Sequence, residues 1–203
     1  MIVTMMALSV LGMPPSLEER VIVEQAMTCR NARAPDPWFL LSVLRLEETA
    51  SVPDSMRGIT LSTGCVESGY YPRALGDCNY GYGKCMAKGF AQLWPWWERR
   101  YGVDRWDAHH SVETYLFHVT RQLEKTRRIC KHKGEKLWRT AEARAVRSGG
   151  KKRCGESTAH YRLLKKWKRV MRRIWEAPHH PLAMRTQVKK NSPQCTSGDA
   201  QSE

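Results

Sequence analysis

One carboxylate, Glu67, has a sequence environment suited to acid catalysis. It begins the segment ESGYYPRALGD (67–77), between an apolar helical run and a turn rich in tyrosine, proline and glycine. Burial against apolar neighbours favours the neutral form of a carboxyl group, and the dipole at a helix C-terminus disfavours a negative charge there. A carboxyl group that keeps its proton near neutral pH can serve as a general acid. We therefore predict that Glu67 donates a proton to a bound substrate.

The residues after Glu67 could hold such a substrate. Aromatic rings offer flat apolar faces with polar edges, which suit sugar rings, and an amide both donates and accepts hydrogen bonds. The amide is Gln92, and the tyrosines are Tyr70, Tyr71, Tyr80 and Tyr82. The segment LWPWW (93–97) adds three tryptophans, Trp94, Trp96 and Trp97. We expect at least two of these three to pack in the core.

Two segments of the chain resemble the catalytic domain of the soluble lytic transglycosylases. ESGYYPRALGD and KGFAQLWPWW follow each other in the order and spacing of that family's two signature segments, and VETYL (112–116) resembles its next helix. The resemblance covers about residues 35–175. It implies an α+β fold that is mostly helical and lysozyme-like, with a small β-hairpin or loop region beside the cleft.

The resemblance also implies a reaction on the glycan strands of peptidoglycan. Glu67 matches the family's catalytic acid/base, Ser68 the hydroxyl that follows it and Gln92 the glutamine that lines the cleft, while Tyr70 and Tyr82 are expected to bind substrate. Glu67 would protonate the glycosidic oxygen between N-acetylmuramic acid and N-acetylglucosamine. It would then take a proton from the sugar's own C6 hydroxyl as a 1,6-anhydro ring closes. This reaction requires no second carboxylate, no cofactor and no metal.

Two residues leave alternatives open. Asp77 is the acid that closely follows Glu67, and in ALGDCN we favour its interpretation as a turn residue. If Asp77 faces the cleft, hydrolysis by two carboxyl groups, as in a lysozyme-type muramidase, becomes the alternative reaction. The family's A-Y-N-A-G segment is replaced here by AEARAVRSGG (141–150), which lacks a tyrosine. Tyr161 could supply that tyrosine from the next helix, or it could equally pack in the core.

Positive charge is concentrated in the last part of the chain. The formal net charge is +14, and residues 119–190 contain 23 Lys and Arg against 5 Asp and Glu. Such a region is suited to an anionic partner, which could be nucleic acid, a membrane surface or a wall polymer. With the resemblance we expect peptidoglycan as the partner, no specific nucleic acid, and a monomer. A non-catalytic binder of an anionic polymer is the competing hypothesis.

Seven cysteines favour an oxidising, extracytoplasmic location, because their spacings lack the paired CxxC pattern of zinc sites. The pairings considered are Cys78–Cys85 around a short glycine-rich loop, Cys130–Cys154 between two helix ends, and Cys29–Cys65. Buried unpaired thiols are the alternative. The apolar segment 1–15 lacks the basic start and cleavage site of a good signal peptide and is too short to span a bilayer. No stable membrane insertion is therefore expected.

Helical segments are expected to position these residues in one domain, residues 16–177. The capping pattern of Ser16 with Glu19, and the pair Asp36–Pro37, begin two helices. Apolar residues at helical spacing predict four more, at 54–68, 111–129, 136–146 and 157–175. Turn-forming residues from 70 to 88 predict an irregular stretch with a small hairpin. Residues 178–203 are expected to be a disordered tail.

Overall fold

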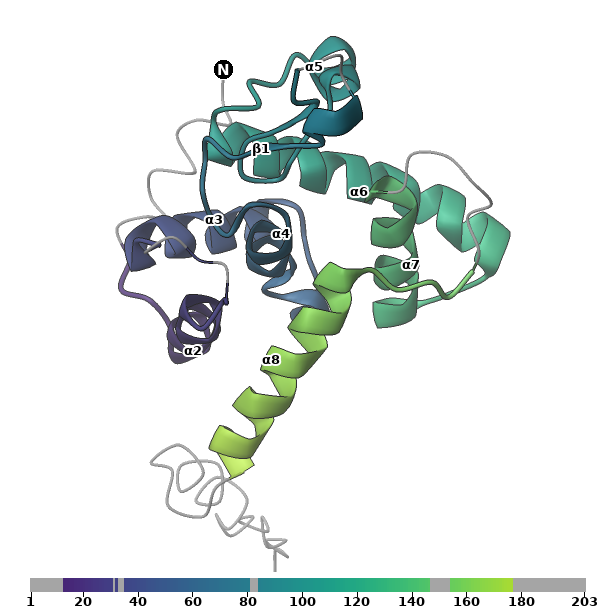
Figure 1. The fold of residues 1–203 in the computed structure, drawn as a ribbon. Coiled ribbons are helices and arrows are strands. Elements are labelled where there is room, and N and C mark those ends of the chain that lie inside the picture. Colours follow the sequence, from purple (N-terminus) through teal and green to yellow (C-terminus); the bar gives the residue numbers. More distant parts are fainter. Residues whose placement is uncertain (1–12, 31, 33–34, 81–83, 147–153, 177–203) are drawn as a thin grey trace, which may run out of the picture. The chain divides into compact units, whose positions relative to one another are not determined.

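A computed structural model describes residues 13–30, 32, 35–80, 84–146 and 154–176 (Figure 1). These residues are mostly helical with a small two-stranded sheet, which confirms the expected secondary-structure content. The chain divides into two compact units, residues 1–167 and 168–203. The described part of the second unit, 168–176, is the end of helix α8. The predicted tail, 178–203, and most of the apolar segment 1–15 lie outside the described residues.

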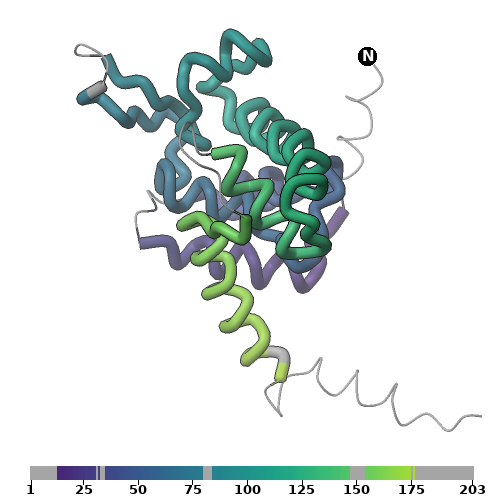
Figure 2. Tube along the Cα trace, turned by 90° about the vertical axis from the view of Figure 1, so that its right-hand side faces the viewer, coloured from purple at the N-terminus to yellow at the C-terminus, as the bar shows by residue number. Residues whose placement is uncertain are grey.

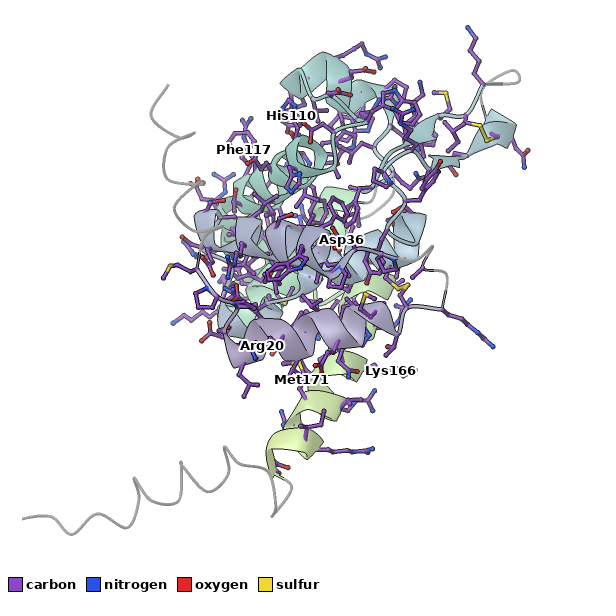
Figure 3. All side chains as sticks on the ribbon, turned by 90° about the vertical axis from the view of Figure 1, so that its left-hand side faces the viewer. Arg20, Asp36, His110, Phe117, Lys166 and Met171 are labelled. Atoms are coloured by element: carbon purple, nitrogen blue, oxygen red, sulfur yellow. A yellow bond between two sulfur atoms is a disulfide. The ribbon has the colours of Figure 1, made fainter. Side chains whose placement is uncertain are left out.

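The first two helices begin at the predicted caps. At the start of α2 (Leu17–Met27) the Ser16 hydroxyl accepts a hydrogen bond from the Glu19 N–H at 3.2 Å, and the Glu19 carboxylate accepts one from the Ser16 N–H at 2.7 Å. At the start of α3 (Pro37–Thr49) the Asp36 carboxylate, labelled in Figure 3, accepts a hydrogen bond from a backbone N–H of the first turn at 3.0 Å. Local capping chemistry therefore sets both helix starts.

Helix α4 (Ile59–Ser68) is anchored by a buried carboxylate of α3. Glu47 is 1% exposed and accepts hydrogen bonds from the N–H groups of Gly58 at 2.7 Å and Thr60 at 2.8 Å. It also accepts one from the Thr60 hydroxyl at 2.7 Å. The first N–H groups of a helix have no partner within the helix, so Glu47 caps α4 from its neighbour.

Helix α4 also packs closely against the second of the two segments quoted above. Phe90 is fully buried, and its ring occupies the space in which a side chain at Gly64 would lie. A Cβ atom at Gly64 would be 2.1 Å from Phe90 Cζ. Because residue 64 is a glycine, the helix that carries Glu67 can contact this segment directly.

The predicted hairpin is confirmed. Strand β1 (Leu75–Gly76) pairs antiparallel with β2 (Ala87–Lys88), with Leu75 opposite Lys88. The short helix η2 (Cys78–Tyr80) lies in the connection, which the Cys78–Cys85 disulfide closes. Helix α5 (Pro95–Tyr101) follows the hairpin.

Three helices complete the described chain: α6 (Ala108–Cys130), α7 (Gly134–Val146) and α8 (Ala159–Glu176). Helices α6 and α7 pack along each other, and the turn η1 (Asp54–Met56) contacts α7 (Figures 1 and 2). Figure 3 shows His110 near the start of α6 and Phe117 two turns further along it. The four segments predicted between residues 54 and 175 are thus helical over most of their lengths.

All three disulfide pairings considered from the sequence are present. They are Cys29–Cys65, Cys78–Cys85 and Cys130–Cys154. Cys29–Cys65 joins the segment after α2 to the turn of α4 that precedes Glu67, and Cys130–Cys154 joins the end of α6 to the segment before α8. Within the described ranges, no helix has the length and apolar character needed to cross a membrane.

Candidate active site

A cleft of about 430 Å³ opens between α4, the hairpin, α5 and the start of α8. Its lining includes Glu67, Asp77, Gln92 and all three tryptophans of LWPWW. Both segments that carry the resemblance therefore face one cavity. A second hollow, of about 500 Å³, lies at the turn between α6 and α7 and contains none of these residues.

Glu67 is the penultimate residue of α4 and faces this cleft. The helix ends at Gly69, which has φ 59°, a left-handed conformation that glycine adopts without strain. The side chain of Glu67 is 35% exposed, so it is less desolvated than the sequence suggested. Its Oε1 lies 2.6 Å from His160 Nε2. Among the described residues, Glu67 Oε2 has no hydrogen-bond partner, and the Glu67 residue lines the cleft.

His160 connects Glu67 to a second carboxylate. Its side chain is 4% exposed, and its Nδ1 lies 2.8 Å from Glu142 Oε1. Burial alone would lower the pKa of His160, but the hydrogen bonds to Glu142 and Glu67 outweigh it and raise the pKa of His160 to about 9. At neutral pH the imidazole therefore carries two protons and donates to both carboxylates.

Glu142 lies on α7 and is 1% exposed. Its carboxylate accepts hydrogen bonds from the Thr158 hydroxyl at 2.7 Å and the Tyr115 hydroxyl at 3.2 Å, in addition to His160. Burial, together with the nearby Glu142, holds the pKa of Tyr115 well above its usual value, so this phenol stays a donor. Three donors satisfy Glu142, as a buried charge requires.

On the hairpin side of the cleft, the side chain of Gln92 bonds the backbone at two places in the hairpin region. Gln92 has φ 49°, and its Nε2 donates to the backbone oxygens of Ala74 at 3.1 Å and Gly89 at 2.8 Å. A Cβ atom at Gly76 would lie 2.2 Å from Gln92 Oε1, so the glycine leaves room for the amide. The predicted position of Gln92 at the cleft is thus held by contacts within the hairpin region.

Asp77 is both a turn residue and a cleft residue. It has φ 54°, which fits the turn interpretation, and it also lines the cleft. Its Oδ2 accepts a hydrogen bond from the indole N–H of Trp94 at 2.8 Å. Because Asp77 faces the cleft, hydrolysis by two carboxyl groups stays an alternative reaction.

The other predicted side chains mostly lie away from the cleft. Ser68 is half-buried, and its hydroxyl donates to the Gly64 carbonyl at 3.1 Å. Tyr70 is 4% exposed and packs beside Phe90, and burial raises the pKa of its phenol. In the described part of the chain the Tyr70 hydroxyl has no hydrogen-bond partner. Tyr82 lies outside the described residues.

Tyr161 belongs to the core. It is 4% exposed and packs with Met56, Ile59 and Leu164, and its hydroxyl donates to Glu135. Tyr161 is not among the described residues that line the cleft. Of its two sequence interpretations, the structure therefore gives the core position.

The three tryptophans of LWPWW pack with core residues and also line the cleft. Trp97 is buried in a cluster with Ala91, Leu93 and Val103, and Trp94 and Trp96 pack against that cluster. All three also line the cleft, so one face of this cluster is a wall of the cavity.

Sequence patterns did not identify His160 or Glu142. The segment AEARAV contains two charged residues, Glu142 and Arg144, so its pattern did not single out the glutamate. The signal for His160 was weaker still, because it lies 93 residues from Glu67 along the chain.

No protein-family model, curated protein or solved structure matches this chain.

Proposed function

We propose that this protein cleaves the glycan strands of peptidoglycan as a lytic transglycosylase with a lysozyme-like fold and Glu67 as its acid/base. The observation that carries the proposal is the cleft in which Glu67 and Gln92 both lie, since each comes from a different segment of the resemblance. The tryptophans of the second segment line the same cavity and suit sugar rings.

The proposed reaction uses the open oxygen of Glu67. Oε2 carries the proton and gives it to the glycosidic oxygen as the bond from that oxygen to C1 of N-acetylmuramic acid breaks. The electron pair of the broken bond stays with the leaving oxygen. The C6 hydroxyl oxygen then bonds to C1, and the Glu67 carboxylate takes the hydroxyl proton. This restores the acid and leaves a 1,6-anhydro end without water.

A lysozyme-type muramidase is the second candidate, and the position of Asp77 favours it. Retaining and inverting glycosidases place two carboxyl groups on either side of the scissile bond. Asp77 faces the cleft that contains Glu67, with one oxygen held by Trp94 at 2.8 Å. It could therefore stabilise the sugar cation or activate a water molecule.

Mass spectrometry of the fragments released from purified peptidoglycan tests both candidates. We expect products that end in 1,6-anhydromuramic acid, lighter by one water than reducing ends, and no release by Glu67→Gln. Asp77→Asn should leave transglycosylation largely intact. Reducing ends that disappear in Asp77→Asn would instead establish the muramidase. Release by Glu67→Gln at the wild-type rate, or no release by the wild-type protein, would refute the catalytic proposal.

The proposed partner and location follow from the same chemistry. Three disulfides are present, and such bonds persist in oxidising compartments. We propose that the protein acts outside the cytoplasm, as a monomer, on a wall whose polymers carry carboxylates and phosphates. The basic residues of 119–190 would then attract that anionic wall. Sedimentation with purified wall should weaken as salt is added, because screening removes this attraction.

A further inference from the structure

We infer that His160 is the positioning residue of the acid/base: fixed by buried Glu142, it holds Oε1 of Glu67 and stabilises the carboxylate that forms when Glu67 gives up its proton. The inference rests on the proposed function and deepens it. It assigns roles to two residues that lie outside both signature-like segments.

The geometry leaves His160 little freedom. Its side chain is 4% exposed, and each ring nitrogen has a carboxylate partner, Glu67 at 2.6 Å and Glu142 at 2.8 Å. A rotation of the ring would break both hydrogen bonds. The side chain of Glu67 is therefore held through one oxygen, and among the described residues the other oxygen has no hydrogen-bond partner.

Glu142 fixes the position of one ring proton of His160. An ionised carboxylate only accepts hydrogen bonds, so His160 must keep its proton on Nδ1. The hydroxyls of Thr158 and Tyr115 hold Glu142 in place at 2.7 and 3.2 Å. The Nδ1 proton is therefore fixed toward Glu142, and the Nε2 proton is directed at Glu67 Oε1. This is the arrangement in which a partner behind a histidine fixes its tautomer.

The titratable groups around His160 come from three helices. Glu67 on α4 and Glu142 on α7 both favour the imidazolium, and burial opposes it. The Tyr115 phenol on α6 contacts Glu142 and stays neutral, because burial and Glu142 hold its pKa well above the usual value. The hydrogen bonds to the two carboxylates prevail, so the site presents a cation behind the acid.

This cation acts when negative charge develops. The proposed reaction starts from the form in which Glu67 carries a proton on Oε2 and His160 is an imidazolium. As Oε2 gives its proton to the glycosidic oxygen, Glu67 becomes a carboxylate 2.6 Å from His160 Nε2. The attraction is stronger in the transition state than in the ground state, which is the condition for catalysis. His160 keeps its proton throughout, and Glu67 regains one from the C6 hydroxyl.

A purely structural role makes a different prediction. In that case the hydrogen bonds would only join α4, α7 and α8, and their loss would lower stability without moving any pH dependence of turnover. A positioning role changes kcat and its pH profile while leaving KM nearly constant, because His160 lies behind Glu67 and not against the substrate.

Two substitutions of His160 separate its contacts. His160→Asn keeps a polar group near Nδ1, toward Glu142, and loses the contact with Glu67. His160→Gln keeps a neutral donor near Nε2, toward Glu67. We expect kcat on peptidoglycan to fall about 10- to 100-fold in His160→Asn, the usual effect of losing a group that orients a site residue, and less in His160→Gln. In both variants the basic limb of the kcat profile should move to higher pH, because the cation is gone.

His109→Gln is the matched control. His109 is half-buried, and its Nε2 lies 2.7 Å from the Ser42 hydroxyl, but it does not belong to the cleft lining that the described residues form. The His109→Gln substitution should leave kcat and the pH profile unchanged. Wild-type kcat and an unchanged pH profile in His160→Asn would overturn the inference and leave the proposed function standing.

An NMR titration, which does not depend on enzyme activity, distinguishes failure of the inference about His160 from failure of the proposed function. Ring nitrogen shifts of His160, followed by NMR, should give a pKa of about 9 in the wild-type protein and a lower pKa in both Glu67→Gln and Glu142→Gln. The same His160 titration in Glu67→Gln would overturn the inference whatever the enzyme does. If His160 responds as expected but the wild-type protein releases no glycan fragments, the proposed function is refuted, and the inference that rests on it is withdrawn.

Discussion

Raising the pH should remove the part of the protein's stability that His160 supplies. Burial lowers the pKa of His160, but hydrogen bonds to Glu142 and Glu67 outweigh it and raise that pKa from its ordinary value of 6.5 to about 9. Folding therefore strengthens proton binding by this histidine. The stabilising contribution is complete below pH about 6.5 and is lost as the pH rises through about 9.

The size of this contribution follows from the difference between the two pKa values. At 1.36 kcal/mol per pH unit, it is on the order of 3 kcal/mol. Such an amount is a sizeable fraction of the 5–15 kcal/mol by which a typical domain is stable, so an unfolding experiment can resolve it. The ring is 4% exposed and contacts two carboxylates, of which Glu142 is buried, so the effect exceeds that of an exposed ion pair.

The assay is urea unfolding, followed by circular dichroism, at pH values from about 6 to about 10. The wild-type free energy of unfolding should fall by about 3 kcal/mol more than that of His160→Asn over this range. His109→Asn changes a half-buried histidine on α6, whereas His160 lies on α8. The free energy of unfolding of His109→Asn should change with pH as that of the wild-type protein does. Parallel curves for the wild-type protein and His160→Asn would refute this prediction, since the histidine would then bind its proton equally in folded and unfolded chains.

Three further changes test the packing around the site. Gly64→Ala should cost about 1–3 kcal/mol in urea unfolding, because a Cβ 2.1 Å from the buried ring of Phe90 forces the core to shift; an unchanged midpoint would contradict that contact. Gly76→Ala should lower kcat on peptidoglycan, because its Cβ would lie 2.2 Å from Gln92 Oε1 and displace the amide that lines the cleft; full activity would show that the amide position is unimportant. Serine at both positions of Cys130–Cys154, which closes a 24-residue separation, should cost about 3–4 kcal/mol, measured by thermal unfolding against the wild-type protein; an equal melting temperature would count against this bridge.

The sequence by itself determined features that depend on neighbouring residues. The caps at Ser16 and Asp36 begin helices because their side chains bond N–H groups within three residues. The turn-forming residues between β1 and β2 gave the hairpin, and Gly69 ends the helix that carries Glu67. The sequence also carried the resemblance on which the expectation of a lysozyme-like fold and of peptidoglycan cleavage rests. These expectations remain proposals for the experiments above.

Only the tertiary structure decided which side chains meet. His160 and Tyr161 are adjacent in the chain, but neighbours on a helix point about 100° apart, so one faces Glu67 and the other the core. Sequence spacing could not choose between them, because either side chain could have pointed at Glu67. The same holds for Glu142, which reaches His160 from another helix. Capping acts over one helical turn, whereas the surroundings of Glu67 depend on how α4, α7 and α8 pack, which no local pattern encodes.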